Sequence, residues 1–380
     1  MITIPARRPT TGRRQLALLA AVQVCAMSLW FSASAVVPAL RAEWGLSREL
    51  AILLTVTVQA GFATGAVCSA ALNLADRLSP RRLVAGSALL AAVATGLLPW
   101  CPHGLAAPLR FLTGFALAGV YPVGMKVVVS WFPRKRGLAL GVLLASLTVG
   151  SALPSLLHAL PWRAVLLASA LLATLGAALA AAFVEAGPDK APAPPWRPRY
   201  LLTMAKDRRQ RSICLGYLGH MWELYAFWAW LPAYLAATGG PQGPTAFVVI
   251  GVCGAAGCLL GGVLSDRCGR VVVATAAMLG SAGCALLSFP ASGTGLLLPV
   301  LLVWGVAVIA DSGQFSAALA ETADPRYVGT ALTAMTALGF LLGAGTIQLL
   351  PLAADAVGWR AAFPALAAGP VLGALALRRR

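Results

Sequence analysis

The sequence predicts an all-α membrane protein with twelve transmembrane helices arranged as two six-helix halves. First, 59% of the 380 residues are hydrophobic and only 11% are charged, whereas about 25% of residues are charged in a typical water-soluble domain. Second, apolar stretches of about 20 residues, long enough to cross a bilayer as helices, recur along the whole chain. Third, short phrases of the first half recur in the second half at nearly constant spacing.

Twelve apolar stretches account for most of the chain. In the first half they cover roughly residues 15–40, 50–74, 82–101, 105–131, 136–158 and 162–184. In the second half they cover roughly residues 212–237, 245–265, 270–290, 293–319, 327–350 and 358–377. A transmembrane β-barrel would instead need alternating segments of about 10 residues, which the sequence lacks.

Basic residues produce the net charge of +17, and they lie in alternate loops. With a cytoplasmic N-terminus, most of the 29 Lys and Arg residues fall in the two tails, the central loop and the other inner loops. The outer loops and outer span edges hold Arg41, Arg48, Arg110, Arg163 and Arg360. This positive-inside pattern predicts that both termini are cytoplasmic and that the protein lies in the inner (plasma) membrane, and it makes a nucleic-acid partner unnecessary.

Motifs of other protein classes are missing from the sequence. Most of the eight cysteines lie in apolar spans without metal-ligand spacing, so we expect neither a metal site nor a disulfide framework. No zinc-protease helix, phosphate-binding loop or nucleophile elbow is found. The sequence therefore predicts that the protein is not an enzyme and holds no cofactor.

A proline-rich, basic segment at residues 185–211 interrupts the apolar pattern. Its prolines favour an extended chain and its positive charge favours the anionic inner leaflet, as in a cytoplasmic linker. We therefore predict an N-terminal six-helix bundle over residues 1–184 and a C-terminal six-helix bundle over residues 212–380.

Three phrases are shared by the two halves. They are Asp76-Arg77 with Asp266-Arg267, PRKRGLAL at 133–140 with PRYVGTAL at 325–332, and Trp162-Arg163 with Trp359-Arg360. Their offsets are 190, 192 and 197 residues. Parallel repeats of six spans predict two bundles about an axis along the membrane normal, which can rock around a central site.

The loop after the eighth span carries a specific signature. It reads Gly262-Val263-Leu264-Ser265-Asp266-Arg267-Cys268-Gly269-Arg270. In this signature, and over essentially its whole length, the chain resembles the major facilitator superfamily. The equivalent first loop keeps Asp76 and Arg77 but has Leu72 and Ser79 where the family usually has glycines. The resemblance implies secondary transport, with interbundle charge contacts in the outward-facing state by Asp76, Arg77, Asp266, Arg267 and Arg270.

The fourth span carries a second resemblance. It opens with Arg110-Phe111-Leu112-Thr113-Gly114 and ends with Trp131-Phe132-Pro133-Arg134-Lys135-Arg136-Gly137. This pattern is similar to the organic-anion, sugar-phosphate and nitrate/nitrite porters of the family. The resemblance implies that Arg110 supports proton coupling; alternatively, Arg110 anchors the outer edge of the span.

Charged side chains inside spans are costly and mark functional candidates. Glu223 lies near the middle of the seventh span, one helical turn after His220 and beside Trp222 and Tyr225. Either Glu223 or His220 can carry a coupling proton. Alternatively, the two hydrogen-bond each other and only hold the span in its bundle.

Asp311 and Gln314 in the tenth span form a second candidate for coupling or gating, with an interhelical hydrogen bond as the alternative. Lys126 in the fourth span either binds an anion, pairs with one of the buried carboxylates, or extends to the membrane interface. Gln23 in the first span is an uncharged candidate for the central cavity.

These residues favour a proton-coupled porter that moves a small solute by alternating access and acts as a monomer in the lipid bilayer. Lys126 and the fourth span favour a small organic or inorganic anion. Efflux of a hydrophobic or cationic compound is the alternative, because aromatic residues surround Glu223. A non-transporting membrane receptor on the same fold is the alternative of another class.

Overall fold

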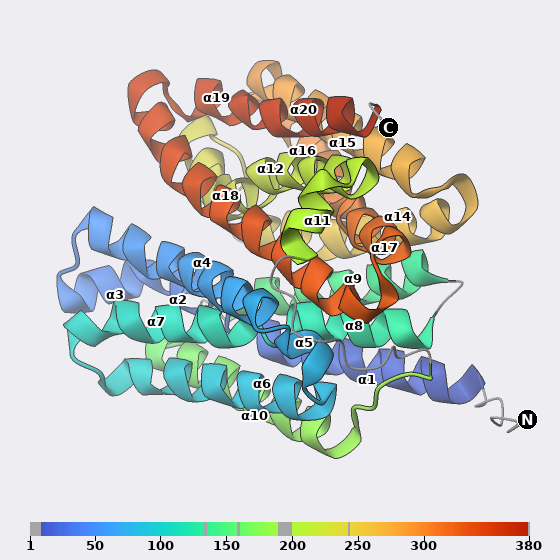
Figure 1. The fold of residues 1–380 in the computed structure, drawn as a ribbon. Helices are drawn as coiled ribbons and strands as arrows, with labels where there is room; N and C mark the ends of the chain where they lie inside the picture. Colours follow the sequence, from blue (N-terminus) through green and yellow to red (C-terminus); the bar gives the residue numbers. More distant parts are fainter. Residues whose placement is uncertain (1–8, 133–134, 158–159, 189–199, 242–243, 379–380) are drawn as a thin grey trace, which may run out of the picture.

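A computed structural model of the chain describes residues 9–132, 135–157, 160–188, 200–241 and 244–378, and the described residues contain helices but no strand (Figure 1). The first half contains α1 (Pro9–Met27), α2 (Ser32–Ala35), α3 (Val37–Trp44), α4 (Arg48–Ala71), α5 (Leu74–Arg77), α6 (Pro80–Leu97), α7 (His103–Leu117), α8 (Tyr121–Trp131), α9 (Arg136–Leu156) and α10 (Trp162–Phe183). The second half contains α11 (Tyr200–Lys206), α12 (Arg208–Thr238), α13 (Thr245–Phe247), α14 (Gly254–Cys268), α15 (Arg270–Ala291), α16 (Leu297–Ala310), α17 (Ser312–Thr322), α18 (Val328–Val357), α19 (Trp359–Ala362) and α20 (Ala368–Arg378). A π-helical segment, Val248–Cys253, joins α13 to α14.

Ten helical segments of the described chain are long and apolar enough to cross a membrane. They correspond to the predicted second to sixth and eighth to twelfth spans. The first predicted span falls short because it is interrupted after α1. The seventh falls short because α12, although 31 residues long, has a low mean hydropathy from its arginines, tryptophans, tyrosines and internal Glu223. The two weak spans occupy equivalent places in the two halves.

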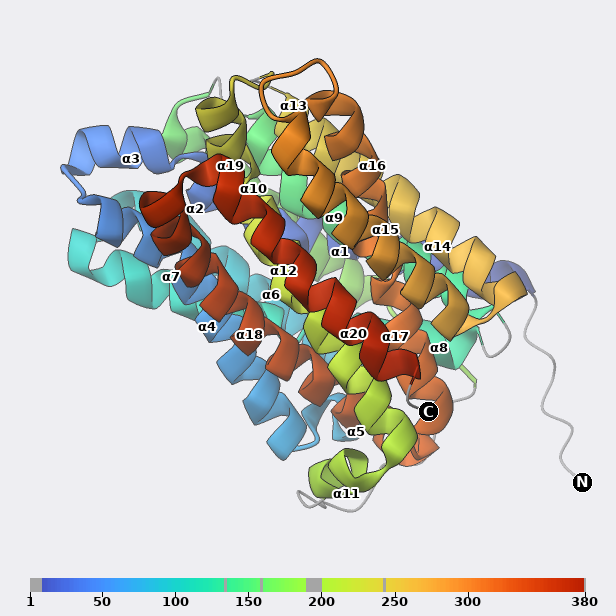
Figure 2. The ribbon, with the colours of Figure 1, turned by 90° about the horizontal axis from the view of Figure 1, so that it is seen from above.

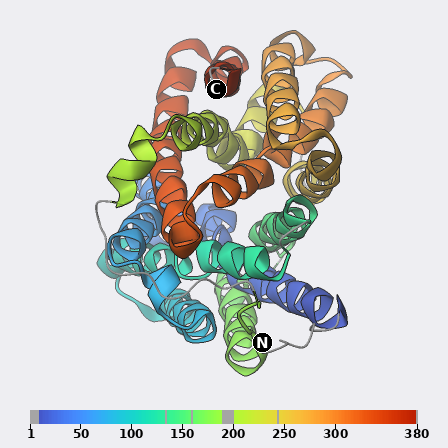
Figure 3. The same cartoon turned by 45° about the vertical axis from the view of Figure 1, so that its right-hand side comes forward.

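The two halves pack against each other along two pairs of helices. α4 contacts α18, and α9 contacts α14. α4 and α18 come together near α5 and diverge toward α3 and α19 (Figure 1). The start of α1 and the end of α20 lie at the same end of the molecule, which comes forward in Figure 3. The structure is therefore closed at the end where α5, α8 and α17 meet.

Several spans are broken near their middle, which the apolar pattern did not reveal. The first is interrupted between Met27 and Ser32, the fourth between Leu117 and Tyr121, and the tenth at Asp311. Broken helices free backbone groups that must find partners inside the protein, and in transporters such breaks line binding sites. The side chains that bind these breaks are therefore candidates for the functional site.

The predicted linker is only partly described, since residues 189–199 lie outside the described residues. Its last part is helical: α11 covers Tyr200–Lys206 and α12 already begins at Arg208. The Asp207 side chain caps α12 by accepting a hydrogen bond from the backbone N–H of Gln210. The seventh helix thus begins a turn before the predicted span.

Candidate functional site

The carboxylate of Asp76 joins the two halves at their closed end. It accepts hydrogen bonds from the backbone N–H groups of Gly329 (3.0 Å) and Thr330 (2.6 Å) and from the Thr330 hydroxyl (2.7 Å). These groups form the first turn of α18, where the helix dipole favours a negative charge. We call Asp76 with Gly329 and Thr330 the first latch.

Asp266 makes the corresponding contact from the other half. It accepts hydrogen bonds from the backbone N–H groups of Gly137 (3.2 Å) and Leu138 (3.0 Å) at the start of α9. Arg270 pairs with Asp266 at 2.6 Å and with Glu321 at 3.1 Å. Asp266 with Gly137 and Leu138 is the second latch, and it repeats the first by the pseudo-symmetry of the chain.

The first latch is the more buried of the two, although its loop departs more from the family signature. The Asp76 side chain is 1% exposed and that of Asp266 is 18% exposed. The latch forms without the glycines that the first loop lacks, because Asp76 binds through its carboxylate and Asn73 additionally donates to the Thr330 hydroxyl at 2.6 Å. Leu72, which replaces one glycine, is 50% exposed.

The signature arginines divide into two groups. Arg270 supports Asp266, whereas Arg77 and Arg267 are exposed and make no hydrogen bond or ion pair with other described residues. Gly269 ends α14 with a φ of 93°, a backbone conformation that favours glycine. The halves are thus joined by carboxylates on helix N-termini rather than by pairs of opposite charges.

Two glycines allow the latches to close. A Cβ at Gly329 would lie 2.5 Å from the Asp76 carboxylate, and one at Gly262 would lie 2.7 Å from the Gly137 carbonyl oxygen.

We expect Gly329→Ala to weaken the first latch and lower the melting temperature. Gly283→Ala is the matched control, because a Cβ there meets no atom within 4 Å; it should be neutral or stabilise the helix by about 0.5–1 kcal/mol. Equal melting temperatures of the two variants would contradict the close packing at Gly329.

Lys126 lies in the first latch. Its Nζ is 2.7 Å from Asp76 Oδ1 and donates to the Ala75 carbonyl oxygen at 2.7 Å, and its side chain is 21% exposed. Its partner is thus neither Glu223 nor Asp311, but the carboxylate that caps α18. In this closed arrangement Lys126 neutralises Asp76 and is not directed at a solute.

Arg110 is completely buried in α7 and binds the break in the first span. Its guanidinium donates to the carbonyl oxygens of Leu29 (3.1 Å) and Trp30 (2.6 Å). These carbonyls follow the C-terminal end of α1, where the helix dipole favours a cation. The alternative of an interfacial anchor at the outer span edge is therefore wrong.

Glu223 lies inside the C-terminal half. Its carboxylate accepts hydrogen bonds from Ser281 of α15 (2.9 and 2.8 Å) and from the indole N–H of Trp304 of α16 (2.7 Å). It is 1% exposed. The structure does not pair it with His220, although the two share a helix face, because His220 turns toward another carboxylate.

That carboxylate is Asp311, which occupies the break between α16 and α17. His220 Nδ1 lies 2.8 Å from Asp311 Oδ1, and both side chains are at most 3% exposed. The contact is not aligned as a hydrogen bond, so both ring nitrogens and Asp311 Oδ1 lack a hydrogen-bond partner among the described residues. The 2.8 Å separation nevertheless places the imidazole ring in direct contact with the carboxylate. The middle of α12 thus carries two separate buried acid sites.

An interbundle aromatic cluster fills the space between the halves. It consists of Trp30, Phe31, Phe62, Tyr225, Trp228 and Phe340. Trp30 lies 5.0 Å from Phe62, 5.8 Å from Tyr225 and 5.1 Å from Phe340 between ring centroids. Because Arg110 holds the Trp30 carbonyl, it also positions this ring in the cluster.

Four buried N–H donors of tryptophan and glutamine side chains in the central helices lack a partner among the described residues. They are Trp30 Nε1, Trp228 Nε1, Gln23 Nε2 and Gln59 Nε2. Of the other candidates, Gln314 is buried in α17 and donates to the Ala310 carbonyl oxygen at 3.2 Å. Trp222 lies instead on the outer surface, between α12 and α20, with its indole N–H 3.4 Å from the Ala365 carbonyl oxygen. It is therefore separate from the central residues.

The latches, the Arg110 site and the aromatic cluster all lie within a single region of sequence similarity. A profile described as Major Facilitator Superfamily matches residues 19–347. The chain belongs to the major facilitator superfamily. It is accordingly a multi-pass membrane protein and a secondary transporter of small solutes, and not an enzyme, as the sequence predicted.

Solved structures of transporters share the fold of this family member. The human organic anion transporter MFSD10 (TETRAN) has 16% sequence identity and a TM-score of 0.80, over 98% of this chain and 100% of that chain. The transporter FucP, in the outward conformation, has 15% identity and a TM-score of 0.75, over 97% of this chain and 99% of that chain. No curated protein sequence matches the chain at the significance required for a relative.

The partners of the candidate residues could not be identified from the sequence. Gly329 and Gly137 occupy the same place in the repeated PRYVGTAL and PRKRGLAL phrases, so the repeat itself was the available signal for the latches. Pro133 and Arg134 of the first phrase lie outside the described residues. No pattern in the sequence pointed to Ser281 and Trp304, because their relation to Glu223 arises only when three helices pack together.

Proposed function

We propose that this transporter couples proton movement to the transport of a small organic solute, with an organic anion as the favoured class. In this proposal twelve helices cross the inner membrane, both termini are cytoplasmic, and a single chain alternates between two states by rocking its halves. The cytoplasmic side is then the closed end, and opening requires both latches to release. The N-terminal half over residues 1–184 and the C-terminal half over 212–380 move as the two units.

The buried His220–Asp311 pair is the observation that carries the proposal of proton coupling. A carboxylate and an imidazole inside a membrane-spanning bundle are costly, and they lie at a helix break beside the interface between halves. Proton binding changes the charge of this pair and therefore its interaction with neighbouring dipoles. Glu223, one turn along α12, is a second carrier in the same half.

The four unpartnered N–H donors support an organic anion as the solute. A solute with carboxylate oxygens satisfies such donors, and the aromatic cluster accommodates its apolar part. MFSD10, a structural neighbour, is described as an organic anion transporter. Lys126 is not assigned to the solute in this proposal, because it already forms an ion pair with Asp76.

Efflux of a hydrophobic cation is the second candidate. Asp311 is a buried carboxylate whose Oδ1 lies against His220 without an aligned hydrogen bond, and the faces of Trp30, Tyr225 and Trp228 can hold a cation. Titration of tryptophan fluorescence separates the candidates, with benzoate as the anion and tetraphenylphosphonium as the cation. Saturable quenching by benzoate is expected; saturation by tetraphenylphosphonium alone would overturn the anion proposal. A non-transporting receptor would give no flux of either compound in proteoliposomes.

Removal of the acid groups tests the coupling. In proteoliposomes, we expect Asp311→Asn and Glu223→Gln to abolish solute accumulation driven by a pH gradient while solute exchange at equal pH is retained. The reason is that exchange needs only reorientation of the solute-loaded transporter, whereas accumulation driven by a pH gradient also needs a group that binds and releases the coupled proton. The control is Asp355→Asn, at an exposed position of α18, which should leave accumulation intact. Undiminished gradient-driven accumulation in either buried variant would remove that residue from the coupling role.

A further inference from the structure

A groove of about 400 Å³ lies on the outer surface of the C-terminal half, between α12, α18 and α20. Its lining is apolar and includes Leu215, Leu218, Trp222, Leu342, Gly369 and Leu372. Leu215 is 47% exposed and Leu372 is 66% exposed. The three helices lie together on the face seen in Figure 2. In a membrane protein this groove opens to lipid and not to water.

Glycines shape the floor of the groove. A Cβ at Gly219 would lie 2.4 Å from the Gly369 carbonyl oxygen, and one at Gly369 would lie 2.4 Å from the Gly219 carbonyl oxygen. The backbones of α12 and α20 are therefore in direct contact, and no side chain fills the surface above their crossing. The flanking leucines and Trp222 stand on either side of this depression.

Arginines lie at one end of the groove. On α12, Arg208 and Arg211 continue the helical spacing of Leu215, Leu218 and Trp222, so they share the lining face. Both arginines are exposed; Arg211 Nη1 donates to the Ala205 carbonyl oxygen of α11 at 3.3 Å, which leaves the other N–H groups of this guanidinium for a headgroup. The Ser212 hydroxyl donates to the Ala376 carbonyl oxygen at 2.7 Å, which brings the end of α20, with its exposed Arg378, next to the start of α12.

The dimensions fit one leaflet of a bilayer. From Arg211 to Trp222, α12 rises by about 16 Å, and half of a hydrocarbon core is about 15 Å. A phospholipid with its headgroup at Arg208 and Arg211 therefore places an acyl chain along the leucines as far as Trp222. Clusters of basic residues at the cytoplasmic ends of helices attract anionic headgroups.

We propose that this groove is a specific binding site for an anionic phospholipid of the inner leaflet, which holds its headgroup at Arg208 and Arg211 and an acyl chain against Trp222. Because the lipid bridges α12, which carries His220 and Glu223, and α20, it stabilises the C-terminal half. The site rests on the proposed cytoplasmic position of the chain ends but not on the nature of the solute.

Brominated lipids test the site, since bromine quenches only nearby indoles. The purified full-length protein is mixed in detergent with phosphatidylglycerol or phosphatidylcholine carrying the same dibrominated acyl chains. The difference between the unmodified protein and Trp222→Phe isolates the signal of Trp222. We expect this signal to be half-quenched at a several-fold lower fraction of phosphatidylglycerol than of phosphatidylcholine.

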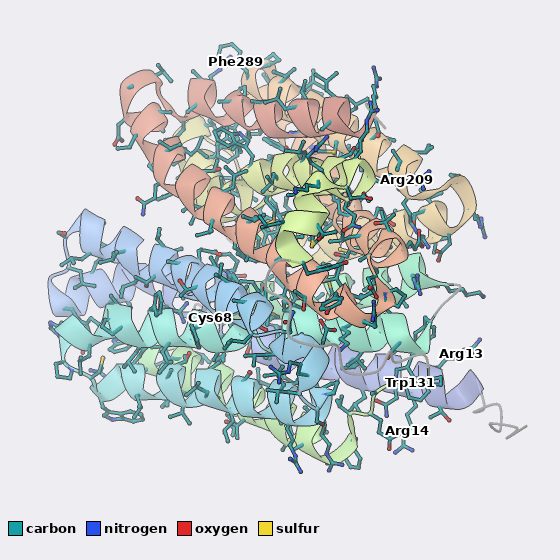
Figure 4. All side chains as sticks on the ribbon, viewed as in Figure 1. Arg13, Arg14, Cys68, Trp131, Arg209 and Phe289 are labelled. Atoms are coloured by element: carbon teal, nitrogen blue, oxygen red, sulfur yellow. The ribbon has the colours of Figure 1, made fainter. Side chains whose placement is uncertain are left out.

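Charge-matched variants complete the experiment. Arg208→Gln/Arg211→Gln should remove the preference for phosphatidylglycerol. The control Arg13→Gln/Arg14→Gln removes two exposed charges at the same end of the molecule, on α1 in the other half, and should keep the preference (Figure 4). Equal quenching of Trp222 by both headgroups would overturn the proposal in favour of non-specific contact with lipid. Absence of any Trp222 signal would overturn it too, and a dimeric mass would then assign the groove to a second copy of the chain.

Discussion

Asp76→Ala is expected to open the closed end of the transporter and to destabilise it by about 3 kcal/mol. The variant removes three hydrogen-bond acceptor contacts from the first turn of α18 and leaves Lys126 without its carboxylate. Breaking a buried ion pair costs about 3–5 kcal/mol, and we take the lower end because part of the Lys126 side chain reaches solvent. A loss of about 3 kcal/mol changes a population ratio by roughly a hundredfold.

Hydrogen–deuterium exchange measures this opening directly. Amides at the start of α18 and in α5 should exchange much faster in Asp76→Ala than in the unmodified protein, and the melting temperature should fall. Asp266→Ala is the matched variant, and its effect should be smaller, because Asp266 is more exposed and accepts fewer bonds from the opposite half. A larger effect of Asp266→Ala would contradict the dominance of the first latch.

A second variant, Asp76→Asn combined with Lys126→Met, separates charge from contact. It removes the ion pair but keeps one carbonyl oxygen to accept a bond from α18 and leaves no unpaired cation. We expect it to recover part of the stability lost in Asp76→Ala. No recovery would mean that capping of α18 by a full negative charge, rather than the paired Lys126, supplies most of the stability.

Arg110→Met is expected to disorder the break in the first span and to lower stability by about 3 kcal/mol. Methionine fills part of the space but cannot donate to the carbonyl oxygens of Leu29 and Trp30, and hydrogen bonds to charged groups contribute about 1.5–3 kcal/mol each. Loss of the buried cation's own desolvation cost offsets part of this. Since Arg110 positions Trp30, the variant should also shift tryptophan emission to longer wavelength.

Two comparisons define what Arg110 contributes. Arg110→Lys retains the charge, but an ammonium lacks the planar fork that reaches both carbonyls, so its stability should lie between those of the other two proteins. Arg163→Met removes an arginine that pairs with Glu43 at 2.6 Å and is 49% exposed, and it should change stability little. Unchanged emission and stability in Arg110→Met would show that the break is held by packing alone.

The sequence by itself determined the fold class, the family and the ends of most helices. Apolar length is a local property, so ten predicted spans coincide with helices that are long and apolar enough to cross a membrane. The correspondence between Asp76 and Asp266 could likewise be recognised in the sequence, because duplication leaves similar phrases at a nearly constant offset. Glu223, Asp311 and Lys126 could also be identified as functional candidates from the sequence, because charged residues inside apolar spans are rare.

Only the tertiary structure decided which groups these residues contact. A single charge in a helix has several possible neighbours, and the choice depends on helix rotation and on breaks that hydropathy does not register. In the folded protein, Asp76 contacts Lys126 and Asp311 contacts His220. Glu223 accepts hydrogen bonds from Ser281 and Trp304. The structure also shows that Arg110 does not lie at the edge of its span but is the cation that binds the carbonyl oxygens of the broken first span. Partners so distant in sequence meet only when buried polar groups must satisfy one another in an interior without water.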